Sequence, residues 1–113
     1  MEHARIYELG EADWKPVRPD LTQGILGASL PGTGATIQSL TVTRVAPGGR
    51  FEVHRDTYRH VLYFFKGEGT VSVEGKEFGA KAGTAVDIPA GKSHSYANLG
   101  KEEMVLITAN LGP

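Results

Sequence analysis

Cysteine is absent from the 113-residue sequence. This absence excludes disulfide bonds, thiolate nucleophiles, and zinc or iron–sulfur centres that use cysteine ligands. Any metal ion that the protein binds must therefore be held by nitrogen and oxygen atoms.

Long apolar runs and an excess of charge of one sign are lacking too. No run approaches the roughly 20 apolar residues of a membrane-spanning helix, and residues 1–10 lack the apolar core of a secretion signal. The 12 Lys and Arg residues nearly balance the 13 Asp and Glu residues, so no strong field attracts nucleic acid or an anionic membrane. We therefore expect a cytoplasmic protein without nucleic-acid or membrane partners.

Helical periodicity is missing as well. The 15 Gly and 6 Pro residues would interrupt helices throughout, and no window of ten or more residues repeats apolar residues at helical spacing. Short runs rich in Val, Ile, Thr, Phe and Tyr alternate instead with turn residues. The expected strands are 36–46, 51–56, 60–66, 69–74, 76–80, 84–88, 93–98 and 103–110. With breaks expected at 47–49 and a hairpin turn at 67–69, the pattern predicts an all-β, antiparallel sandwich, jelly roll or small barrel.

The length of the chain fits a single compact domain. We assign the barrel to residues 35–110 and expect residues 1–34 to form an N-terminal arm and edge strands, which cover the barrel or reach a partner subunit. Val61, Tyr63 and Phe65 alternate along one strand and would place three large apolar side chains on its outward face. Because such a patch is unfavourable in water, we expect a partner or the N-terminal arm to cover it, and a homodimer is the expected assembly.

Histidine is scarce, with four residues, yet three of them stand where a β fold could bring them together. His54 and Asp56 are two residues apart and can share one face of a strand. A tight turn would return His60 beside His54. His94 begins a later strand that could line the same cavity, whereas His3 lies close to the terminus and is left out of the site.

Three imidazoles and one carboxylate indicate a metal site. Neutral imidazole binds Zn, Fe, Ni, Co or Cu, and this donor set leaves coordination positions open for a substrate. Taken singly, each histidine is more typical of the surface or of a hydrogen-bonded core, so only their joint placement favours a metal. Leu62 and Phe64 share the strand face of His60, and Tyr96 shares that of His94. These three side chains would line an apolar substrate pocket or belong to the ordinary barrel core.

Two patterns between residues 48 and 98 resemble the motifs of the cupin superfamily. The second family motif, G-x5-P-x-G-x2-H-x3-N, is complete here and is formed by Gly83, Pro89, Gly91, His94 and Asn98. A chance match in a chain of this length is rarer than about one in 10⁴, given average glycine and proline usage. The glycines, the proline and Asn98 fit scaffold roles in turns and at a strand end.

The first motif, G-x5-H-x-H-x3,4-E-x6-G, is matched in part. Gly48, His54 and Gly67 occupy their motif positions. Asp56 stands where the motif has its second histidine, and His60 stands where it has glutamate. Both replacements are competent ligands, so the set still contains three imidazoles and one carboxylate.

The resemblance implies a cupin double-stranded β-helix, which is an antiparallel jelly-roll barrel. It also implies one divalent transition-metal ion, of the kinds Fe, Mn, Zn, Ni, Co or Cu, with His54, Asp56, His60 and His94 as ligands. Asp56 could bind the ion directly, bind it through water, or act as an outer acceptor or a catalytic general base.

Three functions remain open at this point. The first is a small metalloenzyme that acts on a small polar metabolite, either as a dioxygenase or as a Lewis-acid isomerase or lyase. The second is a non-catalytic module that binds a small molecule or a metal, and the third is a structural dimeric barrel without metal. Four further side chains could reach the pocket mouth and orient a substrate, namely Arg44, Arg50, Tyr58 and Gln38.

Overall fold

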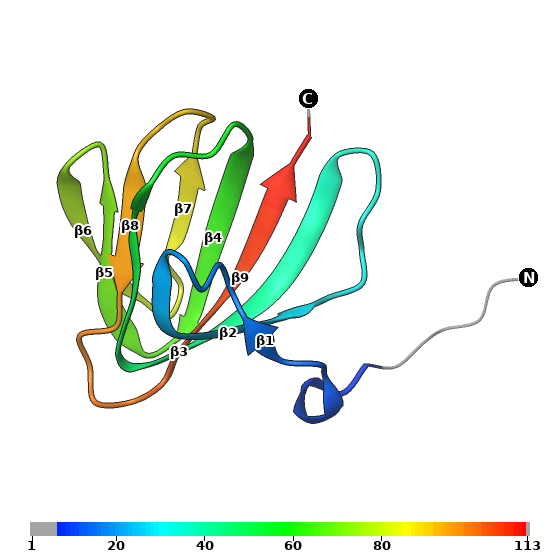
Figure 1. The fold of residues 1–113 in the computed structure, drawn as a ribbon, viewed down its shortest axis with the longest axis horizontal. Coiled ribbons are helices and arrows are strands. Elements are labelled where there is room, and N and C mark those ends of the chain that lie inside the picture. The colour runs from blue at the N-terminus through cyan, green and yellow to red at the C-terminus, as the bar shows by residue number, and fades with distance from the viewer. Residues whose placement is uncertain (1–6, 113) are drawn as a thin grey trace, which may run out of the picture.

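The protein, seen here as a computed structural model that describes residues 7–112, is an antiparallel β structure with one short 3-10 turn (Figure 1). This confirms the all-β prediction. The elements are η1 (Leu9–Glu11), β1 (Lys15–Pro16), β2 (Thr22–Ser29), β3 (Ile37–His54), β4 (Arg59–Lys66), β5 (Glu68–Val73), β6 (Lys76–Lys81), β7 (Ala85–Ile88), β8 (His94–Ala97) and β9 (Met104–Leu111). Within residues 7–112, no helix has the length and hydrophobicity needed to cross a bilayer.

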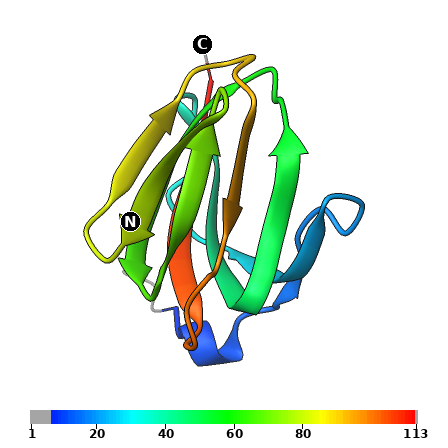
Figure 2. The ribbon, with the colours of Figure 1, turned by 90° about the vertical axis from the view of Figure 1, so that its left-hand side faces the viewer.

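All nine strands belong to one sheet that curls on itself, as Figures 1 and 2 show. Its main path runs β6-β5-β8-β3-β9-β4-β7, and β2 pairs with both β3 and β1. Apolar side chains from both ends of this path pack together, because inward-facing positions alternate with outward ones along every strand. The buried cluster is formed by Ile25, Val45, Leu62, Phe64, Val71, Ala80, Ile88, Tyr96, Met104 and Leu106.

The expected break at 47–49 is not a break, so the prediction of two separate strands at 36–46 and 51–56 was wrong. β3 runs on through this segment and changes partner, from β9 up to Val45 to β8 from Arg50 onward. Gly48 makes the bend with a φ of 80°, which a residue with a side chain rarely adopts. The Gly48 amide donates to the Asn98 carbonyl at 3.1 Å, and the Asn98 amide donates to the Gly49 carbonyl at 2.9 Å. Strand pairing therefore continues across the bend.

The turn at 67–69 is also different from the expected hairpin. β4 pairs with β7 and β9, whereas β5 pairs with β6 and β8, so Gly67 carries the chain from one part of the sheet to another. Gly67 has a φ of 83°. A Cβ at Gly69 would lie 2.1 Å from the Ala97 carbonyl oxygen. The sequence predicts a glycine-containing turn here, but packing determines which strands pair on either side of it.

The N-terminal region adds β1 and β2 to the sheet, with β2 pairing antiparallel along β3. Before β1, the indole of Trp14 donates to the Leu9 carbonyl at 2.9 Å and lies 5.1 Å from the guanidinium of Arg44. His3 lies outside the described residues. On the outer face of β4, Tyr63 is 48% exposed and Phe65 is 46% exposed.

Candidate metal and substrate site

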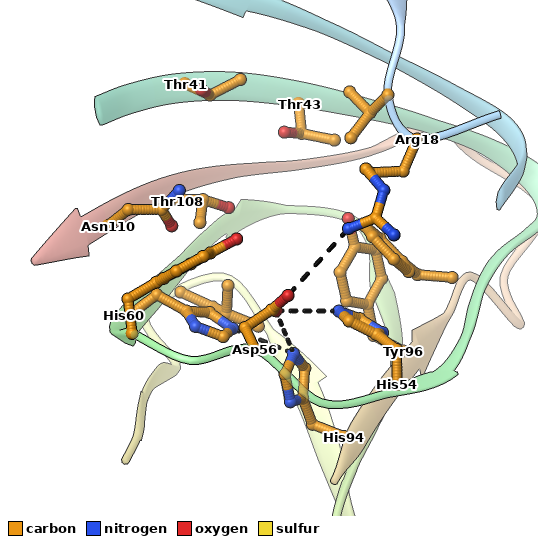
Figure 3. A pocket seen from close by; sticks show the side chains of 14 residues that line it. Arg18, Thr41, Thr43, His54, Asp56, His60, His94, Tyr96, Thr108 and Asn110 are labelled. Atoms are coloured by element: carbon orange, nitrogen blue, oxygen red, sulfur yellow. Dashed lines mark hydrogen bonds and ion pairs between the residues drawn. The ribbon is translucent and has the colours of Figure 1, made fainter. Parts of the chain in front are cut away.

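A cavity of about 250 Å³ lies between the facing parts of the curled sheet. Figure 3 shows that four side chains with metal-binding atoms gather on one side of it, namely His54, Asp56, His60 and His94. These side chains come from the end of β3, the loop after it, the start of β4 and the start of β8. Residues that are up to 40 positions apart in the chain thus share one cavity.

His54 and His94 are direct partners across the β3–β8 pair. Phe51 pairs with Tyr96 on the same two strands, and a register shift lies between the two pairs. The ring of Phe51 stacks on His54 with centroids 4.3 Å apart, and this apolar contact holds the imidazole in the cavity wall. The imidazole rings of His54 and His94 meet edge to face, with centroids 4.1 Å apart.

Asp56 follows β3 rather than lying on it, because the strand ends at His54. The Gly91 amide donates to the Asp56 carbonyl at 2.8 Å, which ties this loop to the turn before β8. Asp56 Oδ2 lies 3.1 Å from His54 Nε2 and 3.4 Å from His94 Nε2. Loop geometry, and not the expected strand alternation, therefore brings this carboxylate to the two imidazoles.

His60 joins the group from the start of β4. Its Nε2 lies 3.0 Å from His94 Nε2, and its Nδ1 is the one buried side-chain nitrogen or oxygen of the described residues that lacks a hydrogen-bond partner. The atoms of His54, Asp56 and His94 lie within 4.8 Å of one another and could hold a metal ion. His60 stands beside this three-residue group, not within it.

The tautomers of two histidines follow from their backbone contacts. His54 Nδ1 lies 2.8 Å from the Glu52 carbonyl, and His94 Nδ1 lies 2.8 Å from the Lys92 carbonyl. A carbonyl oxygen only accepts, so each Nδ1 carries a hydrogen, and in the neutral form of the ring Nε2 presents a lone pair to the cavity. This arrangement fixes the ring orientation in the way that outer hydrogen bonds fix metal-binding histidines.

Lone pairs of two imidazoles and one carboxylate therefore converge on one place in the cavity. The two Nε2 lone pairs face Asp56 Oδ2, which also carries only lone pairs when the carboxylate is ionised. Burial lowers the pKa of His94, and burial together with the neighbouring His94 lowers the pKa of His60. Protonation at these two rings is thus disfavoured, and a cation is the natural partner for the converging atoms.

The sequence-predicted pocket residues divide between the cavity and the core. Leu62 and Tyr96 line the cavity, and burial raises the pKa of the Tyr96 phenol well above its usual value, which keeps it neutral. Phe64 is not among the lining residues. It lies one step further along β4, 2% exposed, with its ring edge to face with Tyr96 at 6.3 Å. Strand alternation correctly predicts that these side chains point to the inner face of the sheet. It does not predict where along the strand the cavity ends and the core begins.

Of the four predicted mouth residues, only Tyr58 lines the cavity. Its pKa is raised by burial and by the neighbouring Asp56 carboxylate. The other three predicted residues have partners elsewhere: Arg44 pairs with Glu103 at 2.9 Å, Arg50 pairs with Glu52, and Gln38 lies against Gly112. Their position on β3 turns them away from the cavity.

Five polar residues that the sequence patterns did not predict also line the cavity. They are Arg18, Thr41, Thr43, Thr108 and Asn110. Thr41 and Thr43 share one face of β3, and Thr108 and Asn110 share one face of β9, so strand alternation could have grouped each pair. Nothing in the local sequence indicates that Arg18, in the loop between β1 and β2, reaches the same cavity.

The sequence matches the Cupin domain family over residues 41–110, which is more than half of the chain. The protein therefore belongs to the cupin family, as its motifs predicted. No curated protein matches the sequence at a significant level.

Solved structures support the same fold. A predicted oxalate decarboxylase from Thermotoga maritima has a TM-score of 0.82 and 20% identity, with 95% of this chain and 98% of that chain covered. The polyketide cyclase RemF from Streptomyces resistomycificus has a TM-score of 0.81 and 19% identity, covering 98% and 83%. KdgF from Halomonas sp. has a TM-score of 0.78 and 19% identity, covering 98% and 96%. At this identity, the likeness concerns the fold alone.

Proposed function

We propose that the cavity holds one divalent transition-metal ion and that the protein is a metal-dependent enzyme acting on a small polar metabolite. The single observation that carries this proposal is the convergence of His54 Nε2 and His94 Nε2 on Asp56 Oδ2, which lies 3.1 Å from the first and 3.4 Å from the second. These three side chains would hold the ion, and His60 would serve as the fourth ligand. Nitrogen and oxygen donors of this kind suit Fe, Mn, Co, Ni, Cu or Zn.

The chemistry that fits the arrangement best is proton transfer, as in an isomerase or a lyase. A bound ion supplies Lewis acidity at open coordination positions. Asp56 Oδ2 faces the imidazoles, while Asp56 Oδ1 lies 4.0 Å from the guanidinium of Arg18. Oδ1 is thus the oxygen left to accept a proton from a substrate. The neutral phenol of Tyr96 and the apolar side chain of Leu62 line the same cavity.

Dioxygenase chemistry is the second candidate. It is favoured by the third imidazole, His60, whose Nε2 lies 3.0 Å from that of His94. Dioxygen uptake with a bound substrate would separate the two candidates, because proton transfer consumes no dioxygen. If a substrate binds at the metal without uptake of dioxygen and without proton exchange with D₂O, the protein is a binding module instead of an enzyme.

Metal content of protein purified without a histidine tag tests the proposal. We expect one equivalent of metal per chain, and a Co²⁺-substituted sample with visible absorption bands that shift in His94→Ala. Ser95→Ala is the matched control, because Ser95 neighbours His94 on β8 but does not line the cavity. Failure to bind any of the six metals after reconstitution would overturn the proposal, provided that circular dichroism shows a folded protein.

A further inference from the structure

A wall of polar side chains faces the donor group across the cavity. It consists of Thr41 and Thr43 from β3 and Thr108 and Asn110 from β9 (Figure 3). Strand register places Thr41 directly beside Thr108, and places Asn110 beside His60. Among the described residues, none of these four side chains has a hydrogen-bond partner.

The polarity of this wall is confined to the cavity. Val45 and Leu106 occupy inward positions on β3 and β9 next to Thr43, and both are fully buried in the apolar core. Threonine is common in strands, but Thr43 is only 2% exposed. Because these polar groups line the cavity and have no partner within the described residues, their natural partner is a ligand or ordered water there.

Arg18 brings a positive charge to the cavity mouth. Its Nε and Nη2 atoms each donate to the carboxylate of Asp20 at 3.3 Å, which leaves Nη1 directed at Asp56 Oδ1, 4.0 Å away. The backbone of Arg18 has a φ of 41° and is closed by a hydrogen bond of 2.8 Å from the Leu21 amide to the Arg18 carbonyl. A residue other than glycine rarely adopts this φ, and such backbone conformations persist where the surrounding structure imposes them.

From the hydroxyl wall and the cation we infer that the cavity binds a short hydroxylated carboxylate. Its carboxylate group would bind Arg18 Nη1 at the cavity mouth, and its hydroxyl groups would bond to the threonines and Asn110. A guanidinium with one edge already paired offers its remaining N–H groups to an anion. The cavity volume of about 250 Å³ equals about eight water molecules, which fits a short acid. This inference rests on the proposed function, since it names the substrate class of the same cavity.

Binding calorimetry with three four-carbon probes tests the inference. L-threonate carries both a carboxylate and hydroxyl groups, butyrate carries only the carboxylate, and erythritol carries only hydroxyl groups. We expect L-threonate to bind the metal-loaded protein at least about tenfold more tightly than either of the other probes, because only threonate satisfies both features. Equal binding of threonate and butyrate would overturn the role of the hydroxyl wall.

Two substitutions separate the two parts of the recognition. Arg18→Gln should weaken threonate binding about tenfold, and the isosteric Thr43→Val should weaken it about fivefold. Arg55→Gln and Thr70→Val are the matched controls, since neither residue lines the cavity. If Arg18→Gln and Arg55→Gln have the same effect, Arg18 is not a recognition residue. Circular dichroism checks that each variant is folded, and Thr108→Val replaces Thr43→Val if the latter is not.

The same titrations on metal-free protein distinguish this inference from the metal proposal. Threonate binding that persists at reduced affinity without metal, and that is still weakened by Arg18→Gln, supports the recognition site independently. Stoichiometric metal binding together with no preference for threonate would overturn the inference and leave the metal proposal standing. The converse result, a preference for threonate in a protein that binds no metal, would support the inference and overturn the metal proposal.

Discussion

His54 on β3 and His94 on β8 lie directly opposite each other, with ring centroids 4.1 Å apart. From Phe51 to His54, β3 advances by three residues, whereas its partner β8 advances by two, from Tyr96 to His94. The extra residue forms a β-bulge. Regular alternation would point His54 to the face opposite Phe51, whereas the bulge turns it to the same side, into the cavity. A single backbone irregularity thus completes the donor group.

Replacement of Asp56 separates a metal ligand from a general base. Asp56→Asn removes the charge of the oxygen that lies 3.1 Å from His54 Nε2. If Asp56 binds the ion directly, metal affinity should fall by more than about 100-fold, beyond the loss typical of an outer-shell partner. Competition with a chromophoric chelator measures this change. Glu52→Gln, an exposed carboxylate on β3, should have no effect, and unchanged affinity in Asp56→Asn would show that Asp56 is not a ligand.

The metal-free protein should lose stability as the pH falls. Burial lowers the pKa of His60 and of His94 in the folded state, whereas histidines in the unfolded chain take up protons near pH 6.5. Below about pH 6.5 the unfolded state therefore binds more protons than the folded state, and the free energy of unfolding decreases. Each such histidine contributes a slope of at most about 1.4 kcal/mol per pH unit. Above that range, neither group changes stability.

Urea denaturation of chelator-treated protein between pH 5 and 8 measures this slope. His60→Gln should reduce it, because one of the two buried titrating groups is removed. A free energy of unfolding that stays constant from pH 8 to pH 5 would contradict the prediction.

Asn98 should be important for stability and not for chemistry. Its Nδ2 donates to the carbonyls of Val45 at 3.0 Å and Glu102 at 2.8 Å, and its Oδ1 accepts from the Gly100 amide at 2.9 Å. Asn98→Ala would leave buried backbone groups without partners and should destabilise the protein by about 3 kcal/mol. Thermal or urea denaturation measures the change, and Leu99→Ala, whose side chain is largely exposed, is the control. Equal stability of the two variants would exclude this bracing role.

We expect the homodimer to form through the outer face of β4. Tyr63 and Phe65 are each nearly half exposed, and the nearby charges of Arg59 and Arg44 are paired within the chain with Asp87 and Glu103. Two copies could therefore meet there without charge repulsion. We expect Tyr63→Glu to shift the protein from dimer to monomer in sedimentation equilibrium. Phe78→Glu, equally exposed on β6, should leave the dimer intact, and a monomeric parent protein would contradict the prediction.

Much of the fold could be predicted because turn chemistry and strand composition are local properties. Gly83, Pro89, Gly91 and Asn98 have the spacing of a family motif, and the strand that they frame is present as β8. Pairing between strands is not local. The segment around Gly48 has the composition of a turn, yet strand pairing continues across its bend because Asn98 and β8 offer new partners for its backbone groups.

The candidate site likewise has features that the local sequence predicts and features that depend on distant strands. The amino-acid sequence alone limits the atoms that could bind a metal, since cysteine is absent and His54, Asp56, His60 and His94 offer nitrogen and oxygen. Which of these atoms converge, and which other residues share their cavity, depends on how distant strands pack. Register, a bulge and a loop contact aim each side chain, and those features depend on packing between strands that are far apart in the chain. Arg18 and the threonine wall could be found only once those strands were in place.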